Sequence, residues 1–429
     1  MTQRNGLGRR EFLKAAAGAV AVPSVIPATS LGAQGVLSPS ERINVALIGN
    51  GKIGGSHLGR LLGSAGEVQI RAVCDVKRWA RKDFKKKIEN RYADAAGMSN
   101  YKGCDDYNEF EKVLDRDDID AVFICVPDHW HAIIASRAIE AGKDVYCEKP
   151  LTLTVGEAQH LRDTAARYGA IFQTGSQQRS SGNFRKAATI VRNGWIGQIK
   201  QVQVGFGHFP PDTTLPVQAI PDGLDYDRWL GPAPWKPYNE ERVKGAYSGG
   251  WRRFRDYSGR KNTDWGAHHF DIVQWALGMD GHGPVRFIPP GHAGYEYQTH
   301  VYETGTEVQR RDPDQSSIKF IGTEGTVWCG RGDLKVDPPS LTKRSPKGDE
   351  ARLYESGSHH GNFFHGIRTR QETICPAWVG ASSAMVCHLC NIGRWIDRPF
   401  EWDPKHEQVV DDPHAARWLD RPDRAPWQL

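Results

Sequence analysis

"INVALIGNGKIGG", residues 43–55, places a continuous apolar run directly before a glycine-rich turn. An unbroken apolar run of this length is typical of a strand buried on both faces of a parallel sheet. Gly49, Gly51 and Gly54 fit the pattern G-x-G-x-x-G, and residues 56–64 then continue as a helix. A strand, a glycine turn and a helix in this order predict a parallel α/β domain that binds a dinucleotide.

The three glycines serve different purposes in such a turn. Gly49 permits the tight turn, Gly51 lets a pyrophosphate approach the backbone, and Gly54 lets the helix and strand pack closely. The start of the helix presents free N–H groups to the phosphates. We therefore expect the whole turn to bind a nicotinamide dinucleotide: Gly49, Asn50, Gly51, Lys52, Ile53 and Gly54.

The choice of dinucleotide depends on Asp75, which ends the second predicted strand 21 residues after Gly54. A carboxylate here accepts hydrogen bonds from the adenosine ribose hydroxyls and repels the extra phosphate of NADP, so the sequence favours NAD. Lys77, Arg78 and Arg81 follow closely. They leave NADP open as the alternative, because they would bind that phosphate if the loop turned toward it.

The pattern of elements divides the chain in two. Strands alternate with helices over residues 41–175, which predicts a doubly wound α/β domain. Beyond this point residues 198–207 alternate like a strand with one wet face, and residues 316–330 resemble two strands around a glycine turn. We expect residues 176–429 to form an α+β domain with a large, mostly antiparallel open sheet. The other predicted elements are strands over 68–76, 119–127 and 144–150 and helices over 79–97, 131–142 and 267–278.

Three further motifs are "VPDHWHA" at residues 126–132, "CEKPLT" at 147–152 and "DWGAHHFDIVQWALG" at 264–278. With the glycine turn, they make the chain similar to the family of glucose–fructose oxidoreductase, inositol dehydrogenase and MocA (Gfo/Idh/MocA), from about residue 44 almost to the C-terminus. The resemblance implies an NAD-binding Rossmann domain, a substrate-binding second domain, and hydride transfer between a sugar or polyol carbinol carbon and the nicotinamide. It places in the substrate site Lys149, Asp264 and His268, and around the cofactor Pro127, Asp128, His131, Glu148, Lys149 and Gln177.

The spacing of the last motif suggests how these residues divide the chemistry. Asp264 and His268 are four residues apart, so they share a face if the helix has already begun at Asp264. A neutral histidine is suited to removing the hydroxyl proton when hydride leaves carbon. We assign His268 as the general base, Asp264 as its orienting residue and Lys149 as the cation that polarises the reacting oxygen. Lys149 with a lowered pKa is the alternative base. His269 is turned about 100° from His268, and we expect no metal site.

The N-terminus has the layout of an export signal. Residues 8–35, "GRREFLKAAAGAVAVPSVIPATSLGAQG", combine a basic start, a short apolar part and small residues. Arg9 and Arg10 resemble a twin-arginine signal, which a translocase reads to export folded proteins. We expect cleavage after Ala33, a signal over residues 1–33, a periplasmic or otherwise exported product and no stable membrane insertion. Removal of the leader, with its net charge of +3, lowers the formal net charge from +5 to +2, so nothing favours a nucleic-acid partner.

Export restricts the function, because free nucleotide is scarce outside the cytoplasm. We therefore expect a tightly bound NAD that is re-oxidised in place by a second substrate. One alternative is a redox-neutral glycosidase or lyase that acts through a keto-sugar. The other is a sugar-binding protein without catalysis. From the family resemblance we also expect a homodimer or homotetramer.

One insertion distinguishes this chain from simpler members of the family. "WRRFRDYSGRK", residues 251–261, carries five basic residues against Asp256. This charge predicts a subunit contact by default, with a cation for an acidic sugar as the alternative. Three tryptophans nearby are candidates for stacking on a sugar: Trp229, Trp235 and Trp251.

Overall fold

The computed structural model of the 429-residue chain describes residues 41–207, 213–247, 249–311 and 316–429. The predicted twin-arginine signal, residues 1–33, lies outside the described residues. Within the described ranges, no helix is long and apolar enough to cross a membrane. All eight cysteines fall in these ranges and have free thiols.

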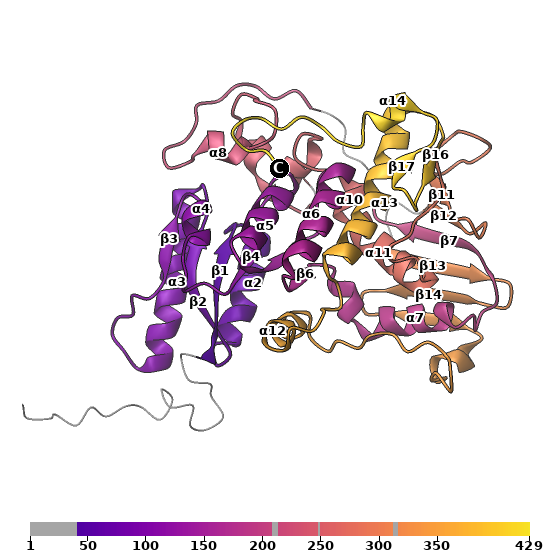
Figure 1. Cartoon of the computed structure of the whole chain (residues 1–429), viewed down its shortest axis with the longest axis horizontal. Coiled ribbons are helices and arrows are strands. Elements are labelled where there is room, and N and C mark those ends of the chain that lie inside the picture. The colour runs from indigo at the N-terminus through magenta and orange to yellow at the C-terminus, as the bar shows by residue number, and fades with distance from the viewer. Residues whose placement is uncertain (1–40, 208–212, 248, 312–315) are drawn as a thin grey trace, which may run out of the picture. The chain divides into compact units, whose positions relative to one another are not determined.

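The first half forms a six-stranded parallel sheet in the order β3-β2-β1-β4-β5-β6. Each strand is followed by a helix that returns the chain to the starting edge, as the alternating pattern predicted (Figure 1). The strands are β1 (Ile43–Ile48), β2 (Val68–Cys74), β3 (Asp105–Tyr107), β4 (Ala121–Ile124), β5 (Asp144–Cys147) and β6 (Phe172–Thr174). The helices are α2 (Lys52–Gly63), α3 (Arg78–Ala96), α4 (Glu111–Leu114), α5 (His131–Glu140) and α6 (Val155–Tyr168).

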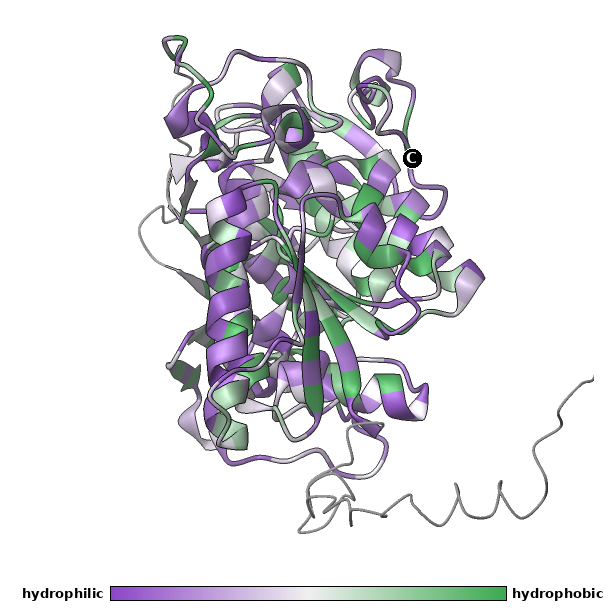
Figure 2. Cartoon of the chain, turned by 90° about the vertical axis from the view of Figure 1, so that its left-hand side faces the viewer, coloured by the Kyte–Doolittle hydropathy of each residue, from purple (hydrophilic) through white to green (hydrophobic). Residues whose placement is uncertain are grey.

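Burial explains why the glycine turn is held firmly at the centre of this sheet. β1 lies between β2 and β4, and almost all of its side chains are buried. α3 is different: only Phe84, Ile88 and Ala93 are buried, and most of its other side chains are polar, so it is largely hydrophilic in Figure 2. The apolar run of β1 therefore fixes the turn, whereas the charged helix beside it covers the sheet.

The second half contains a nine-stranded sheet in the order β15-β14-β13-β7-β12-β11-β10-β16-β17. Neighbouring strands are antiparallel except for β7 and β12, which confirms the predicted mixed, mostly antiparallel sheet. The strands are β7 (Ile199–Gly205), β10 (Arg286–Ile288), β11 (Thr299–Val301), β12 (Glu307–Arg310), β13 (Ser317–Gly322), β14 (Thr326–Gly330), β15 (Leu334–Asp337), β16 (Phe400–Asp403) and β17 (Gln408–Val409).

Helices from the second half also complete the first. The second-half helices are α7 (Gly182–Arg192), α10 (Lys261–Asp264), α11 (Gly266–Leu277), α12 (His359–Thr369), α13 (Ala377–Ile396) and α14 (Pro413–Ala416). α13 packs against both α6 and α11, and so joins the two halves (Figure 1). Phe363 and Phe364 of α12 lie in the same apolar core as β1 and β4. The sequence pattern gave no sign that the chain returns to the first sheet this late.

A segment of the second half crosses the carboxyl edge of the first sheet. It comprises residues 221–247 and 249–252, called the strap, with α8 (Tyr226–Leu230), α9 (Glu240–Val243), β8 (Gly245–Ala246) and β9 (Gly249–Gly250). The Asp225 N–H donates to the Val76 carbonyl at 3.0 Å, and the Arg78 N–H donates to the Gly223 carbonyl at 2.8 Å. The strap has an apolar cluster around Trp229 and Trp251, which Tyr257 from the following segment completes. The strap is therefore a packed, hydrogen-bonded segment that covers the carboxyl edge of the sheet.

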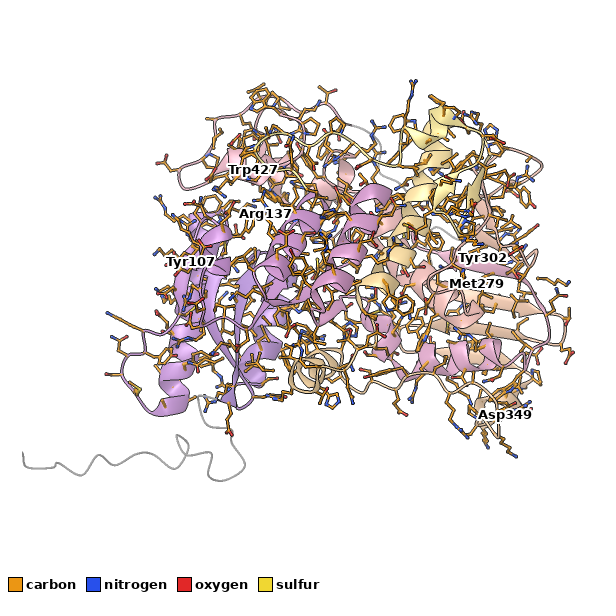
Figure 3. The ribbon with its side chains drawn as sticks, viewed as in Figure 1. Tyr107, Arg137, Met279, Tyr302, Asp349 and Trp427 are labelled. Carbon is orange, nitrogen blue, oxygen red and sulfur yellow. The ribbon has the colours of Figure 1, made fainter. Side chains whose placement is uncertain are left out.

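The C-terminal segment reinforces this edge. Trp427 packs edge-on against Trp130 with ring centroids 5.7 Å apart. Arg424 donates from Nε to the Gly231 carbonyl of the strap at 2.9 Å. Figure 3 shows Trp427 near Arg137 of α5, far from Tyr302 and Met279 beside the second sheet. The end of the chain thus helps to fix the strap.

Candidate active site

The glycine turn has the geometry that each glycine was predicted to supply. Gly49 has φ +97°, and a Cβ there would meet the Cys125 carbonyl oxygen at 2.5 Å. A Cβ on Gly54 would overlap the Gly49 carbonyl, because α2 starts against the turn. A Cβ on Gly51 would meet nothing within 4 Å. The open space at Gly51 therefore leaves room for a group that approaches the backbone closely, while the other two glycines are required by packing.

The side-chain amide of Asn50, next to Gly51, lacks hydrogen-bond partners among the described residues. α2 begins at Lys52, and its N-cap, Gly51, has no side chain to satisfy the free N–H groups. Asn50 is buried, and neither polar atom of its side-chain amide has a hydrogen-bond partner among the described residues. Orphaned N–H groups at a helix start attract phosphate. The turn therefore fits the pyrophosphate of a dinucleotide.

Asp75 lies at the end of β2 beside this turn. Its Oδ2 accepts from the Asn50 N–H at 2.7 Å, and its Oδ1 accepts from the Lys77 N–H at 2.8 Å. Burial raises the pKa of Asp75, although these two N–H groups counteract the effect. The carboxylate is thus oriented by backbone at the place where a ribose would lie.

Lys77, Arg78 and Arg81, the basic residues that could bind the extra phosphate of NADP, contact protein groups in the structure. Lys77 Nζ donates to the Val243 carbonyl of the strap at 3.0 Å. Arg81 donates from Nη1 to the backbone carbonyl of Asp75 at 3.0 Å and from Nε to Asp106 at 3.3 Å. The Arg78 side chain packs against Gly223 of the strap. All three therefore hold protein groups around Asp75.

A cleft of about 1230 Å³, part of it open to solvent, runs between the turn and the strap. The glycine turn and Asp75 form one end, and the Glu148–Lys149 strand end forms the other. Val243, Ala246, Tyr247 and Trp251 of the strap lie opposite the turn. The predicted site residues that line the cleft are Gly49, Asn50, Gly51, Lys52, Ile53, Asp75, Pro127, Asp128, His131, Glu148 and Lys149. Those outside its lining are Gly54, Gln177, Asp264 and His268.

Lys149 joins the two halves at the second end of the cleft. Its Nζ donates to the backbone carbonyl of Asp264 at 2.7 Å and to Asp264 Oδ1 at 3.1 Å. α10 ends at Asp264 and α11 begins at Gly266, so the condition for a shared face, one helix that contains both Asp264 and His268, is not met. The physical reason is visible in the hydrogen bonds: Lys149 takes the Asp264 carbonyl, and the His268 N–H donates to Trp265 instead. Asp264 therefore partners Lys149, in place of the predicted role of orienting His268.

Two more cations converge on the Asp264 carboxylate. Arg252 Nε lies 3.4 Å from Oδ1, and Lys261 Nζ lies 3.7 Å from Oδ2. Burial alone would raise the pKa of Asp264, but Lys149, Arg252 and Lys261 outweigh it and hold the pKa below its usual value. Arg252 also lines the cleft. Arg252 therefore has the position expected for the alternative, a cation for an acidic sugar, while the subunit contact predicted for the insertion stays a prediction.

His268 is buried behind this cluster. Burial, with the positive charges of Lys149 and Arg331, lowers its pKa well below the ordinary value. Its Nδ1 has no hydrogen-bond partner among the described residues. His269 packs against Trp265 and Phe206. His268 is thus a neutral imidazole with a free ring nitrogen, a little removed from the cleft wall.

Asp128 and His131 have different environments although they belong to one motif. Asp128 is buried, and burial raises its pKa to about 7 against the opposing charge of Arg252. Its Oδ2 has no hydrogen-bond partner in the described structure. The His131 ring lies between the carbonyl oxygens of Pro150, at 2.6 Å, and Val126, at 2.9 Å. His131 therefore fixes the backbone after Lys149, whereas Asp128 is a proton-holding group in the cleft.

Sequence reasoning missed the support behind Glu148. His57 Nε2 lies 3.0 Å from Glu148 Oε1, and His57 Nδ1 lies 2.8 Å from His360 Nε2. Gln177, predicted to contact the cofactor, donates to Glu148 Oε1 at 2.8 Å. Burial alone would raise the pKa of Glu148, but His57 outweighs it and holds the pKa below its usual value. The only available sequence signal was the position of His57 on the helix that follows the glycine turn.

The three candidate tryptophans differ in whether they line the cleft. Trp229 and Trp251 line the cleft. Trp235 is 64% exposed and lies outside the lining. Two of them are thus available to a bound ligand.

The fold is a dinucleotide-binding α/β domain followed by an α+β domain with a mostly antiparallel sheet. Residues 43–176 match the family model described as "Oxidoreductase family, NAD-binding Rossmann fold". Residues 201–429 match the model described as "Oxidoreductase family, C-terminal alpha/beta domain". The chain belongs to the Gfo/Idh/MocA oxidoreductase family.

Named relatives share part of the chain. Glycosyl hydrolase family 109 protein 1 of Shewanella sp. (strain MR-4) is 30% identical over 48% of this chain and 47% of its own length. Inositol 2-dehydrogenase of Salmonella typhimurium is 28% identical over 42% of this chain and 50% of its own. The chain thus spans about half the length of these relatives. A crystal structure of aldose-aldose oxidoreductase from Caulobacter crescentus, 15% identical, matches with a TM-score of 0.57 over 84% of this chain and 99% of that one. That likeness shows the fold alone.

Proposed function

We propose that this protein is an NAD-dependent oxidoreductase that transfers hydride between a carbinol carbon of a sugar or sugar derivative and a tightly bound nicotinamide. The observation that carries the proposal is the Lys149–Asp264 contact at the end of the cleft that the glycine turn opens. It places a fixed cation and a carboxylate where the two halves of the chain meet. The relatives named for inositol 2-dehydrogenase support the reaction class.

The residues divide the work as follows. When bound, NAD supplies the hydride acceptor. Lys149, held by Asp264, donates a hydrogen bond to the substrate oxygen and stabilises negative charge as the carbonyl forms. His268, which lies behind the cleft wall, is the general base of this proposal, and Lys149 is the alternative proton acceptor. Trp229 and Trp251 give the sugar an apolar wall.

The end of the cleft that the glycine turn and Asp75 form, called the adenosine end, fits NAD better than it fits NADP. Asp75 would repel a ribose phosphate, and Lys77 and Arg81 already serve as donors to protein groups. The strap supports tight binding, because it covers the cleft and is fixed to both sheet edge and C-terminal segment. Release of the dinucleotide would require several of these bonds to break.

The twin-arginine leader supports export of the folded, NAD-loaded protein to the periplasm. A retained cofactor requires re-oxidation in place by a second substrate. Replacing Arg9 and Arg10 with Lys should keep the protein in the cytoplasm, and unchanged recovery from the periplasm would contradict this route. We also propose a homodimer or homotetramer, which light scattering on the purified protein tests.

The activity is tested by single-turnover kinetics on the NAD-loaded protein. Aldoses, inositols, glycosides and uronates are mixed with it in turn, and the absorbance of reduced nicotinamide is followed. We expect at least one sugar to reduce the bound NAD. A full panel without reduction would favour the sugar-binding alternative.

A redox-neutral glycosidase or lyase is the second candidate, favoured by the relative named as a glycosyl hydrolase. Asp128 gives this candidate a structural basis, since a carboxyl with a pKa of about 7 can protonate a leaving group at neutral pH. Free sugar released from a glycoside without net NADH would establish this reaction over the first.

A further inference from the structure

The Lys149 end of the cleft holds more positive than negative charge. Lys149 Nζ and Arg252 Nε approach the same oxygen, Oδ1 of Asp264, at 3.1 and 3.4 Å. Lys261 Nζ lies 3.7 Å from Oδ2. The Asp264 carboxylate therefore faces three cations, and Glu148, whose pKa is held below its usual value, is the second carboxylate at this end. Asp128 adds only part of a negative charge at neutral pH, because burial raises its pKa to about 7.

Arg252 is built into this end and is not a mobile surface residue. Its Nη1 donates to the Ala246 carbonyl at 3.0 Å, and its guanidinium lies 4.1 Å from the Trp251 ring centroid. Its side chain is only 16% exposed. A stacked, anchored guanidinium presents its donors in a fixed plane, which suits a carboxylate.

Arg255 of the same insertion does not share this position. Arg255 is exposed and stacks on Trp395 and Trp418, with centroid distances of 5.0 and 4.8 Å. Arg252 lines the cleft together with Lys149, Asp128 and Trp251, whereas Arg255 does not. Arg252 is thus the basic residue of the insertion that lines the cleft, and Lys261 reaches Asp264 from outside the lining.

We infer that the substrate is an acidic sugar whose carboxylate binds Arg252 beside Lys149. This inference rests on the proposed function and names the substrate class of the same site. Partly buried cations in excess are costly unless an anion joins them, and a bound carboxylate supplies the missing charge. Its position next to Lys149 leaves the reacting hydroxyl of the same sugar ring within reach of the polarising cation.

The test compares binding within pairs that differ only at the carboxylate. D-Glucuronate and D-glucose, then D-galacturonate and D-galactose, are titrated into the NAD-loaded protein by calorimetry and by tryptophan fluorescence. We expect each uronate to bind about 10- to 100-fold more tightly than its neutral partner, the range for a charge-assisted hydrogen bond. Arg252→Gln should bring this ratio close to unity. Arg252→Lys should retain part of the preference, because it keeps the charge and loses the planar fork.

Arg255→Gln is the matched control, since it removes the same charge from the same insertion outside the cleft. It should leave the preference unaltered. Equal affinity for both members of each pair in the unmodified protein would overturn the inference, as would a preference that survives Arg252→Gln. A uronate preference in binding without reduction of NAD by any sugar would support the inference and refute the proposed hydride transfer. If neutral and acidic sugars reduce the bound NAD with the same half-saturating sugar concentration, the hydride transfer is supported and the inference is refuted.

Discussion

The two ends of the cleft differ in how they are assembled. The adenosine end comes from one short piece of chain, the glycine turn and Asp75, connected by the Asn50 N–H bond to Asp75 at 2.7 Å. The other end, which we propose is the catalytic end, draws Lys149 from the first half and Arg252 and Asp264 from the second. The first end is a property of one βαβ unit, and the second exists only when both halves are packed.

This difference teaches where the chemistry can vary. A local turn can keep the same dinucleotide in proteins with different second domains. The residues that face the substrate depend on α10, the strap and the start of α11. Changes at the Lys149 end should therefore leave dinucleotide binding unchanged, and changes at the glycine turn should leave the residues that face the substrate in place.

The largest effect is expected from Lys149→Met. Loss of the cation that polarises the reacting oxygen should reduce the single-turnover rate of NAD reduction by about 10²- to 10⁴-fold. The amount of nucleotide that copurifies with the protein should be unchanged, because the turn and Asp75 are intact. A variant that loses its nucleotide as well would show that the two ends are coupled.

Two glycine variants test the adenosine end. Gly51→Ala should weaken NAD binding severely without changing the melting temperature in the absence of NAD, since its Cβ meets no protein atom within 4 Å. Gly49→Ala should lower both the affinity for NAD and the melting temperature without NAD, because φ is +97° and the Cβ would meet the Cys125 carbonyl oxygen. Backbone strain of this kind costs about 1–3 kcal/mol. Thermal unfolding with and without added NAD separates the two results. Equal stability of both variants would contradict the roles assigned to these glycines.

Asp75→Ser should change cofactor choice by a smaller factor. Removing the carboxylate removes its repulsion of a ribose phosphate, so the preference for NAD over NADP should fall about tenfold, as for one charged hydrogen-bonding group. Competition binding of the two dinucleotides measures the ratio. An unaltered ratio would mean that Lys77 or Arg81, and not Asp75, decides it.

Asp128 should produce a smaller, pH-dependent effect. Its pKa is raised from 3.8 to about 7 in the folded protein, so the folded state holds an extra proton between these values. Stability should therefore fall as the pH rises from about 4 to about 7, with a slope of at most about 1.4 kcal/mol per pH unit, and should not fall further above pH 7 through this group. Asp128→Asn should flatten the change in melting temperature between pH 5 and pH 7. The same slope in the variant would assign the effect to other groups.

The adenosine end could be predicted from the sequence because its signals are local. The apolar run, the three glycines and Asp75 lie in one stretch, and each has a fixed steric or electrostatic purpose. The parallel sheet followed from the same periodicity. α12 was missed because its phenylalanines fill the first core after a long excursion through the second half.

The catalytic end could be predicted only in part. Lys149, Asp264 and His268 were identified by family motifs, but spacing alone suggested a shared helix for the last two. The bond from Lys149 to the Asp264 carbonyl spans 115 residues of sequence and separates α10 from α11. The position of Arg252 could not be predicted for a similar reason: its orientation depends on Trp251 and Ala246, whose positions come from the fold of the strap.

The most direct test of the proposed chemistry follows a deuterium label. The protein is purified with its bound nucleotide, incubated with perdeuterated sugars in turn, then denatured, and the released nucleotide is examined by mass spectrometry. We expect NADH that carries deuterium on the nicotinamide ring, formed by the unmodified protein and not by Lys149→Met. Released NAD without label after every sugar, or NADP in its place, would contradict NAD-dependent hydride transfer at this site.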